Sequence, residues 1–130
     1  APRHLFTYGT LRPSLGHPAS RRLDGASVPA GPATLEGALH HLGRYPGVVP
    51  GAGAGRVHGE LVELLPAGAD ALLAALDAYE GPEYDRVVAD TRTASGATVP
   101  AWVYVLRAVP PHARPIPGGD WAAEAGAADG

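Results

Sequence analysis

The sequence predicts an α+β fold, a small and mostly antiparallel β-barrel with one main packed helix and a short second helix. Three observations predict this fold. Short stretches of alternating apolar and polar residues recur along the chain, Gly- and Pro-rich turns separate them, and only one segment has strong helical periodicity. The chain has 130 residues, which suits one domain with a single core.

Five stretches are rich in apolar, aromatic or β-branched residues and are predicted to be strands. In the second of them, His40 and His41 are adjacent and therefore point to opposite faces, so they cannot bind one metal ion together. The third has mixed residues on both faces, which suits a barrel whose interior holds a small polar site. The predicted strands cover residues 5–8, 34–42, 56–64, 84–93 and 98–106.

The main helix is predicted over residues 69–79. Its apolar residues fall at helical spacing and form one stripe, and Gly81-Pro82 ends the helix. A short second helix is predicted near residues 18–23. The segment 43–55 holds five glycines and two prolines, so we expect turns there, with Tyr45-Pro46-Gly47 as one of them and a flexible hairpin connection after it. The stripe consists of Leu72, Leu73, Leu76 and Tyr79.

Composition excludes several classes of function. The chain has no Cys, which excludes disulfides, thiolate zinc sites and Cys nucleophiles. The net charge is -3 and the arginines are scattered, so no basic patch indicates nucleic acid as a partner. No apolar run is long enough to cross a membrane, and no signal peptide is visible. We therefore expect a soluble cytoplasmic protein that binds neither membrane nor nucleic acid; the oligomeric state is left open.

Two stretches carry candidate functional residues. The first strand ends at Gly9-Thr10, where backbone N–H groups can hold an anion, although an ordinary turn is the alternative. Glu80 stands at the end of the predicted helix, where nearby carbonyl groups disfavour its ionised form and raise its pKa. This position suits a proton-transfer group, with a solvent-exposed helix end as the alternative. Glu83 and Glu60 are competing acidic candidates.

Four motifs occur in a fixed order along the chain. They are Tyr8-Gly9-Thr10-Leu11-Arg12, the run from Leu42 to Gly51, Val57-His58-Gly59-Glu60-Leu61, and the run from Leu76 to Arg86. Together they resemble the γ-glutamylcyclotransferase-like family, which includes the γ-glutamylamine cyclotransferases and the AIG2-like proteins. The resemblance runs from about Leu5 to Trp121, and it implies the γ-glutamylcyclotransferase-like fold. We expect residues 1–121 to form the domain and 122–130 a flexible tail.

The resemblance also implies an activity. Such an enzyme cyclises a γ-glutamyl amide or amine to 5-oxoproline and releases the amine. Residue by residue, the match implies Glu80 as the catalytic base and acid, and Tyr8, Gly9, Thr10 and Leu11 as the substrate-binding loop. The implied partner is a small γ-glutamyl compound, and the chemistry needs no cofactor and no metal. A non-catalytic small-molecule-binding protein of the same fold is the alternative, because one fold hosts many functions.

Overall fold

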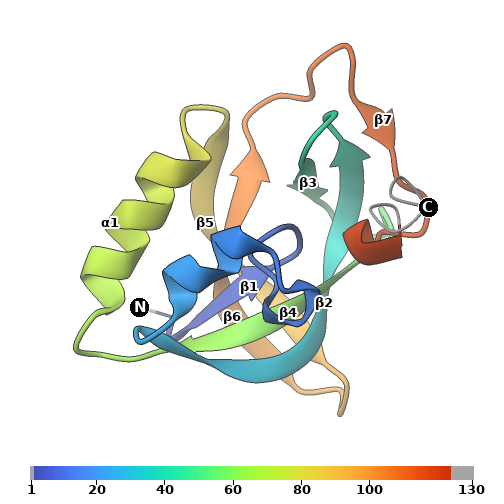
Figure 1. Cartoon of the computed structure of the whole chain (residues 1–130). Coiled ribbons are helices and arrows are strands. Elements are labelled where there is room, and N and C mark those ends of the chain that lie inside the picture. Colours follow the sequence, from blue (N-terminus) through green and yellow to red (C-terminus); the bar gives the residue numbers. More distant parts are fainter. Residues whose placement is uncertain (1, 124–130) are drawn as a thin grey trace.

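The computed structural model describes residues 2–123 (Figure 1). The complete elements in this part of the chain are seven strands, one α-helix and two 3₁₀ helices, and residues 121–123 are also helical. In chain order they are β1 (His4–Thr7), η1 (Pro13–Leu15), η2 (Pro18–Leu23), β2 (Ser27–His41), β3 (Pro46–Pro50), β4 (Arg56–Leu64), α1 (Ala69–Glu80), β5 (Tyr84–Thr93), β6 (Thr98–Leu106) and β7 (Arg114–Pro115).

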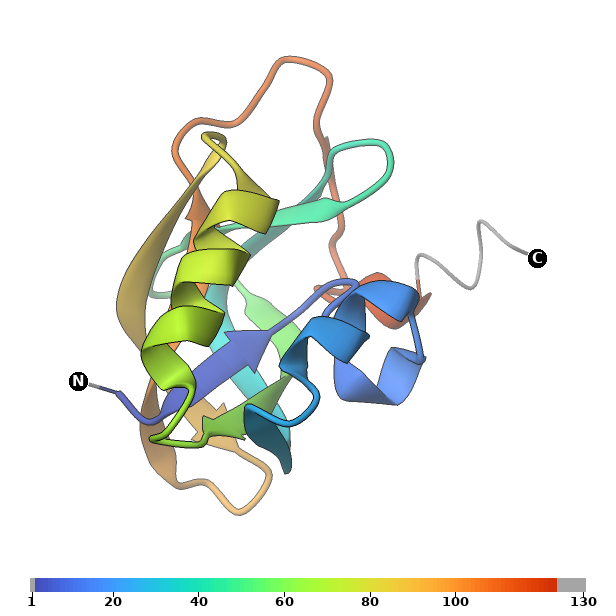
Figure 2. The same cartoon turned by 60° about the vertical axis from the view of Figure 1, so that its left-hand side comes forward.

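Five strands close into a barrel. They are hydrogen-bonded in the order β1-β4-β2-β3-β6, and pairing between β6 and β1 closes the ring. The pairings are antiparallel except β1–β6 and β3–β6, which are parallel. Strand β5 pairs with β6 along its whole length and also reaches β2. Helix α1 stands beside the barrel, and η2 lies next to it near the end of β1 (Figure 2). The predicted fold class is confirmed.

Two apolar clusters stabilise this arrangement. One fills the barrel interior and contains Phe6, Leu61 and Val103, each at most 2% exposed. The other lies between the barrel and α1, where Leu73 and Leu76 of the helix pack with other buried residues, among them Leu5, Val62 and Leu106. The interior cluster is apolar, and two of its members, Phe6 and Tyr8, also line the pocket described below.

The prediction of individual elements was uneven. Strands β4, β5 and β6 have the predicted bounds, and α1 is one residue longer than predicted. The predicted turns at 45–47 were wrong, because β3 begins at Pro46 and pairs with β2 from His41 to Gly37. Its two prolines stand at the strand ends, where a missing N–H disturbs the ladder least. Strand β2 begins at Ser27, seven residues before the predicted start, and its register shifts between Pro29 and Gly31.

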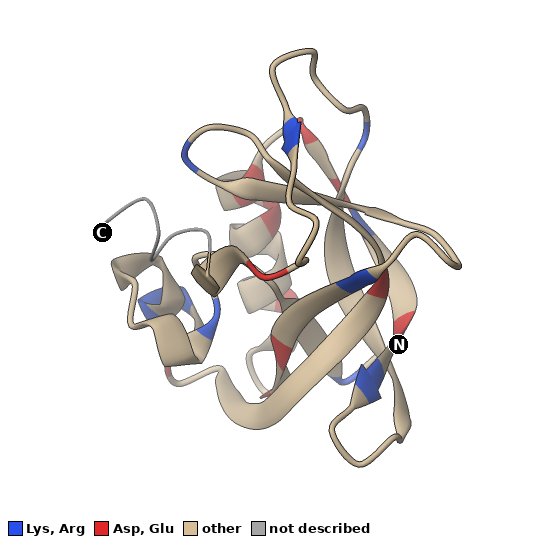
Figure 3. Ribbon diagram, turned by 90° about the vertical axis from the view of Figure 1, so that its right-hand side faces the viewer, with Lys and Arg blue, Asp and Glu red and all other residues tan. Residues whose placement is uncertain are grey.

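The segment after β6 returns to the barrel. Ile116 and Trp121 are buried, and the indole ring of Trp121 lies 4.9 Å from the imidazole ring of His41. Trp121 therefore packs back on the domain. Of the predicted flexible tail, residues 124–130 lie outside the described residues, and the domain boundary stays a prediction. Acidic and basic residues are interspersed around the fold (Figure 3). No helix within residues 2–123 is long and apolar enough to cross a membrane.

Candidate active site

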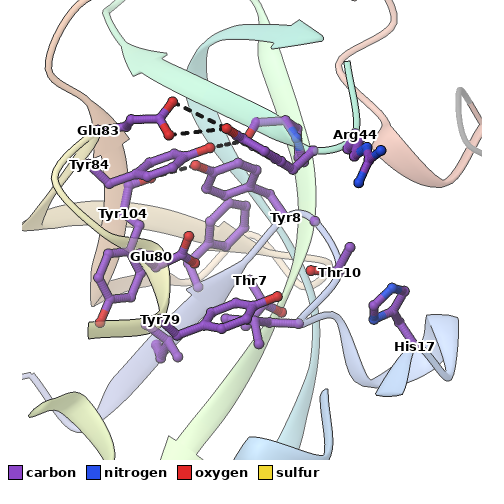
Figure 4. Close-up of a pocket in the computed structure, with 16 residues that line it drawn as sticks. Thr7, Tyr8, Thr10, His17, Arg44, Tyr79, Glu80, Glu83, Tyr84 and Tyr104 are labelled. Carbon is purple, nitrogen blue, oxygen red and sulfur yellow. Dashed lines mark hydrogen bonds between the residues drawn. The ribbon is translucent and has the colours of Figure 1, made fainter. Parts of the chain in front are cut away.

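A pocket of about 400 Å³ opens where the end of β1, the last turn of α1 and the start of β3 meet (Figure 4). It lies on the helix side of the barrel, and Phe6 and Tyr8 of the interior cluster also line it. The predicted substrate loop, Tyr8 to Leu11, forms one wall, and Glu80 projects from the opposite side. The fold thus brings together two sets of residues that the sequence singled out separately.

The loop that follows β1 is held from both ends. The Tyr8 hydroxyl donates a hydrogen bond of 2.6 Å to the Tyr104 carbonyl, and the Arg12 N–H donates one of 3.0 Å to the Gly9 carbonyl. Among residues 2–123, no acceptor pairs with the backbone N–H groups of Gly9, Thr10 and Leu11. Three successive free N–H groups beside a pocket can bind an anion such as a carboxylate.

Gly9 has a steric role in this wall. A Cβ atom at this position would lie 2.8 Å from Cγ of Pro46, the first residue of β3. Real Cβ atoms keep farther from their neighbours, so any side chain here would push the loop and β3 apart. The sequence suggested that Gly9 must be small in order to approach a ligand. The close approach to Pro46 is a second reason, and it comes from the protein itself.

Glu80 is the last residue of α1, and its carboxylate faces the pocket (Figure 4). Within the described part of the chain it accepts no hydrogen bond and forms no ion pair. Burial without a partner disfavours the charged form and raises the pKa of Glu80 to about 7. The predicted rise in pKa is therefore present, but its cause is burial and not the helix-end carbonyl groups.

The two competing carboxylates are already paired. Glu83 lies at the pocket rim, where it accepts hydrogen bonds of 3.1 and 3.3 Å from the Tyr45 hydroxyl. Glu60 lies away from the pocket and accepts hydrogen bonds from Ser14 and from Arg12, the latter at 2.8 Å. Although partial burial opposes its ionisation, these hydrogen bonds hold the pKa of Glu60 below its usual value. Neither carboxylate offers the pocket an unpaired acceptor, as Glu80 does.

Several tyrosines that the sequence alone does not assign to the site also line the pocket. The Tyr84 hydroxyl donates a hydrogen bond of 2.7 Å to the Pro46 carbonyl, and the Tyr104 hydroxyl donates one of 2.7 Å to Asp77. Burial raises the pKa of both, so both stay neutral and act as walls. Tyr79, expected in the apolar stripe of the helix, is 40% exposed at the pocket and lies 4.1 Å below the Arg22 guanidinium. These three tyrosines reach the pocket through contacts between residues far apart in the sequence, which no local sequence pattern indicates.

Metal ligands do not gather in this pocket. Across residues 2–123, no three His, Asp or Glu side chains are placed to hold a metal ion together. What the pocket offers is one unpaired carboxylate, free backbone donors and aromatic walls. This combination can bind a small molecule through a carboxylate and transfer a proton.

The fold and the pocket thus define a small β-barrel protein with a pocket beside its main helix that can take a small molecule. Residues 5–123 match the family model described as "Gamma-glutamyl cyclotransferase, AIG2-like". The match covers most of the chain, which therefore belongs to this family.

Relatives support this assignment. The chain is 35% identical over 119 residues to the γ-glutamylcyclotransferase family protein YtfP of Escherichia coli strain K12, covering 90% of this chain and 94% of that protein. An AIG2-like protein from Mus musculus has 26% identity and a TM-score of 0.66, covering 85% of this chain and 80% of the other. An uncharacterized protein from Pyrococcus horikoshii shares the fold, with a TM-score of 0.72 at 22% identity and coverage of 97% and 95%.

Proposed function

We propose that this chain is a γ-glutamyl cyclotransferase, which cyclises a γ-glutamyl amide or amine to 5-oxoproline and releases the amine, with Glu80 as base and then as acid. One observation carries the proposal. The unpaired and partly buried carboxylate of Glu80 shares a pocket with the free N–H groups of Gly9, Thr10 and Leu11. A γ-glutamyl compound has the complementary groups, an α-carboxylate and an α-ammonium on one carbon.

The loop supplies orientation. Its N–H groups bind the α-carboxylate of the substrate, and the Tyr8 hydroxyl bond to the Tyr104 carbonyl keeps the loop in place. With the α-carbon fixed, the α-amine is directed toward Glu80 and the γ-carbonyl folds back within reach of it. Fixing both ends of a flexible chain converts an improbable ring closure into a near-attack geometry.

The raised pKa of Glu80 suits a base that takes a proton from the α-ammonium group of the substrate. The α-ammonium group of a γ-glutamyl compound adjoins a free carboxylate, so it is a weaker acid than a peptide N-terminus, whose pKa is roughly 8. Raising the pKa of Glu80 to about 7 narrows the difference in pKa that the proton transfer must overcome. A carboxylate at the ordinary value of 4.5 makes the same transfer less favourable by about 3 kcal/mol. Burial therefore gives Glu80 the basicity that the reaction requires, at a pH where much of it is still ionised.

The Glu80 side chain alone can carry out the proton transfers that the reaction needs. The Glu80 carboxylate takes a proton from the α-ammonium, and the freed amine nitrogen attacks the γ-carbonyl carbon to close a five-membered ring. Collapse of the tetrahedral intermediate breaks the bond to the leaving nitrogen, which receives a proton from the Glu80 carboxyl group. The regenerated Glu80 carboxylate then takes the second proton from the ring nitrogen and passes it to the released amine, which leaves as an ammonium ion. The products are 5-oxoproline and a free amine, and the step uses no metal, nucleotide or covalent intermediate.

The test is a search for product. The chain is incubated with a library of γ-glutamyl amino acids and amines, and mass spectrometry follows 5-oxoproline and the released amine. We expect stoichiometric appearance of both from at least one compound. Binding of γ-glutamyl compounds in a calorimeter without release of 5-oxoproline from any of them would instead support the non-catalytic binding protein.

A further inference from the structure

The two halves of the proposed site come from elements far apart in the chain. Glu80 ends α1, whereas the substrate loop follows β1 near the start of the chain. The helix packs on the barrel through apolar side chains such as Leu73 and Leu76, and apolar contacts have no preferred direction. A displacement of about 1 Å at a catalytic group can cost on the order of a hundredfold in rate, so directional contacts are needed here.

A chain of hydrogen bonds links the two halves. The Tyr104 hydroxyl on β6 donates a bond of 2.7 Å to Oδ1 of Asp77, which lies three residues before Glu80 in α1. The carbonyl of the same Tyr104 accepts the 2.6 Å bond from the Tyr8 hydroxyl, at the start of the substrate loop. Tyr104 therefore contacts the helix through its side chain and the loop through its backbone.

Asp77 is itself held by a third element. Arg86 on β5 donates bonds of 2.8 and 3.2 Å to its two carboxylate oxygens, and the Arg86 guanidinium lies 4.3 Å from the centre of the Trp102 ring. Hydrogen bonds from Arg86 hold the pKa of Asp77 below its usual value, so it stays charged where Glu80 titrates. Asp77 does not line the pocket and cannot touch a substrate there.

We propose that Asp77 is a positioning residue of this enzyme: by holding Tyr104 and Arg86, it fixes the last turn of α1 relative to the substrate loop. The inference rests on the proposed cyclotransferase function, since it concerns the placement of Glu80. Without Asp77, no side-chain hydrogen bond or ion pair among residues 2–123 ties the last helical turn to the barrel, and Glu80 moves out of its partly buried position.

The chain offers a matched control. Asp85 on β5 forms an ion pair of 2.8 Å with Arg107 on the same hairpin, and both side chains are about half exposed. Neither residue lines the pocket. If Asp77 served only as a surface ion pair, its removal would resemble the removal of Asp85, and isolated surface pairs contribute little.

The experiment compares wild type with Asp77→Ala, Asp77→Asn, Tyr104→Phe and Asp85→Ala. Circular dichroism checks the fold, kcat and KM are measured separately, and carbon-13 NMR of labelled glutamate follows the carboxyl titration of Glu80, assigned with Glu80→Gln. In Asp77→Ala we expect a fall in kcat of about ten- to a hundredfold with a smaller change in KM. We also expect the pKa of Glu80 to move from about 7 toward 4.5. Tyr104→Phe shifts both readouts in the same direction, and Asp85→Ala shifts neither.

Three results would overturn the inference. One is a folded Asp77→Ala protein whose kcat and Glu80 titration match wild type, and another is an Asp85→Ala protein with the same losses. If Asp77→Ala does not fold, Tyr104→Phe and Asp77→Asn are used to test the inference. The third overturning result is wild-type kcat and wild-type Glu80 titration in both of these variants. A wild-type protein that turns over no γ-glutamyl compound contradicts the proposed function instead, while the carboxyl titration still tests the role of Asp77.

Discussion

The buried carboxylate of Glu80 should make the protein less stable at neutral pH than at acid pH. Its pKa is about 7 in the folded chain and about 4.5 when exposed. Between these values the folded protein holds a proton that the unfolded chain lacks, so the free energy of unfolding falls as the pH rises. The full loss, reached above about pH 7, is about 3 kcal/mol for a shift of this size.

Glu80→Gln removes this titration and keeps the shape of the side chain. Subtracting the free energy of unfolding of wild type from that of the variant cancels the contribution of every other titrating group. We expect the variant's stability advantage to grow by about 3 kcal/mol between pH 4 and pH 8. Urea unfolding of both proteins across this range measures it, with Glu63→Gln at an exposed position of β4 as control. A pH-independent difference would refute the assignment of a buried, unpaired carboxylate.

Two further predictions concern the loop and the chemistry. Gly9→Val should weaken substrate binding at least about tenfold while the protein stays folded, since its Cβ would displace Pro46 and the loop beside it. Calorimetry measures the affinity against the control Gly118→Val, where a Cβ meets open space. Equal affinities of the two variants would contradict the loop assignment. Chelator should leave the release of 5-oxoproline unchanged, since proton transfer needs no metal; loss of activity that zinc restores would show the opposite.

Runs rich in apolar, aromatic and β-branched residues carried the strand predictions that succeeded. Strands β5 and β6 are rich in apolar and β-branched residues and pair as one hairpin, so local sequence was sufficient. Strands with Gly and Pro gave no such signal. Gly47 of β3 lies against the Leu106 side chain, with which any Cβ would collide, so a glycine typical of turns is required here by packing. Such a contact joins two distant segments and leaves no local pattern.

The site was predictable where one residue and its neighbours sufficed. Glu80 stands before a helix-ending Gly-Pro pair, and Gly9 follows an apolar strand, so both were visible in the sequence. Tyr84 and Tyr104 could not be assigned to the pocket from the sequence, because they join it only through barrel closure and helix packing. The cause of the raised Glu80 pKa was missed for the same reason, since burial is a property of the folded chain.

The most direct test of the central claim is the rate of 5-oxoproline release by wild type and by Glu80→Gln, Glu83→Gln and Glu60→Gln, with circular dichroism confirming each fold. Gln keeps the size of the side chain but cannot accept the ammonium proton. We expect Glu80→Gln to lose about a hundred- to ten-thousandfold in rate, whereas the other two variants retain activity. A Glu80→Gln protein within about threefold of wild type, with either other variant inactive, would move the catalytic role to that residue.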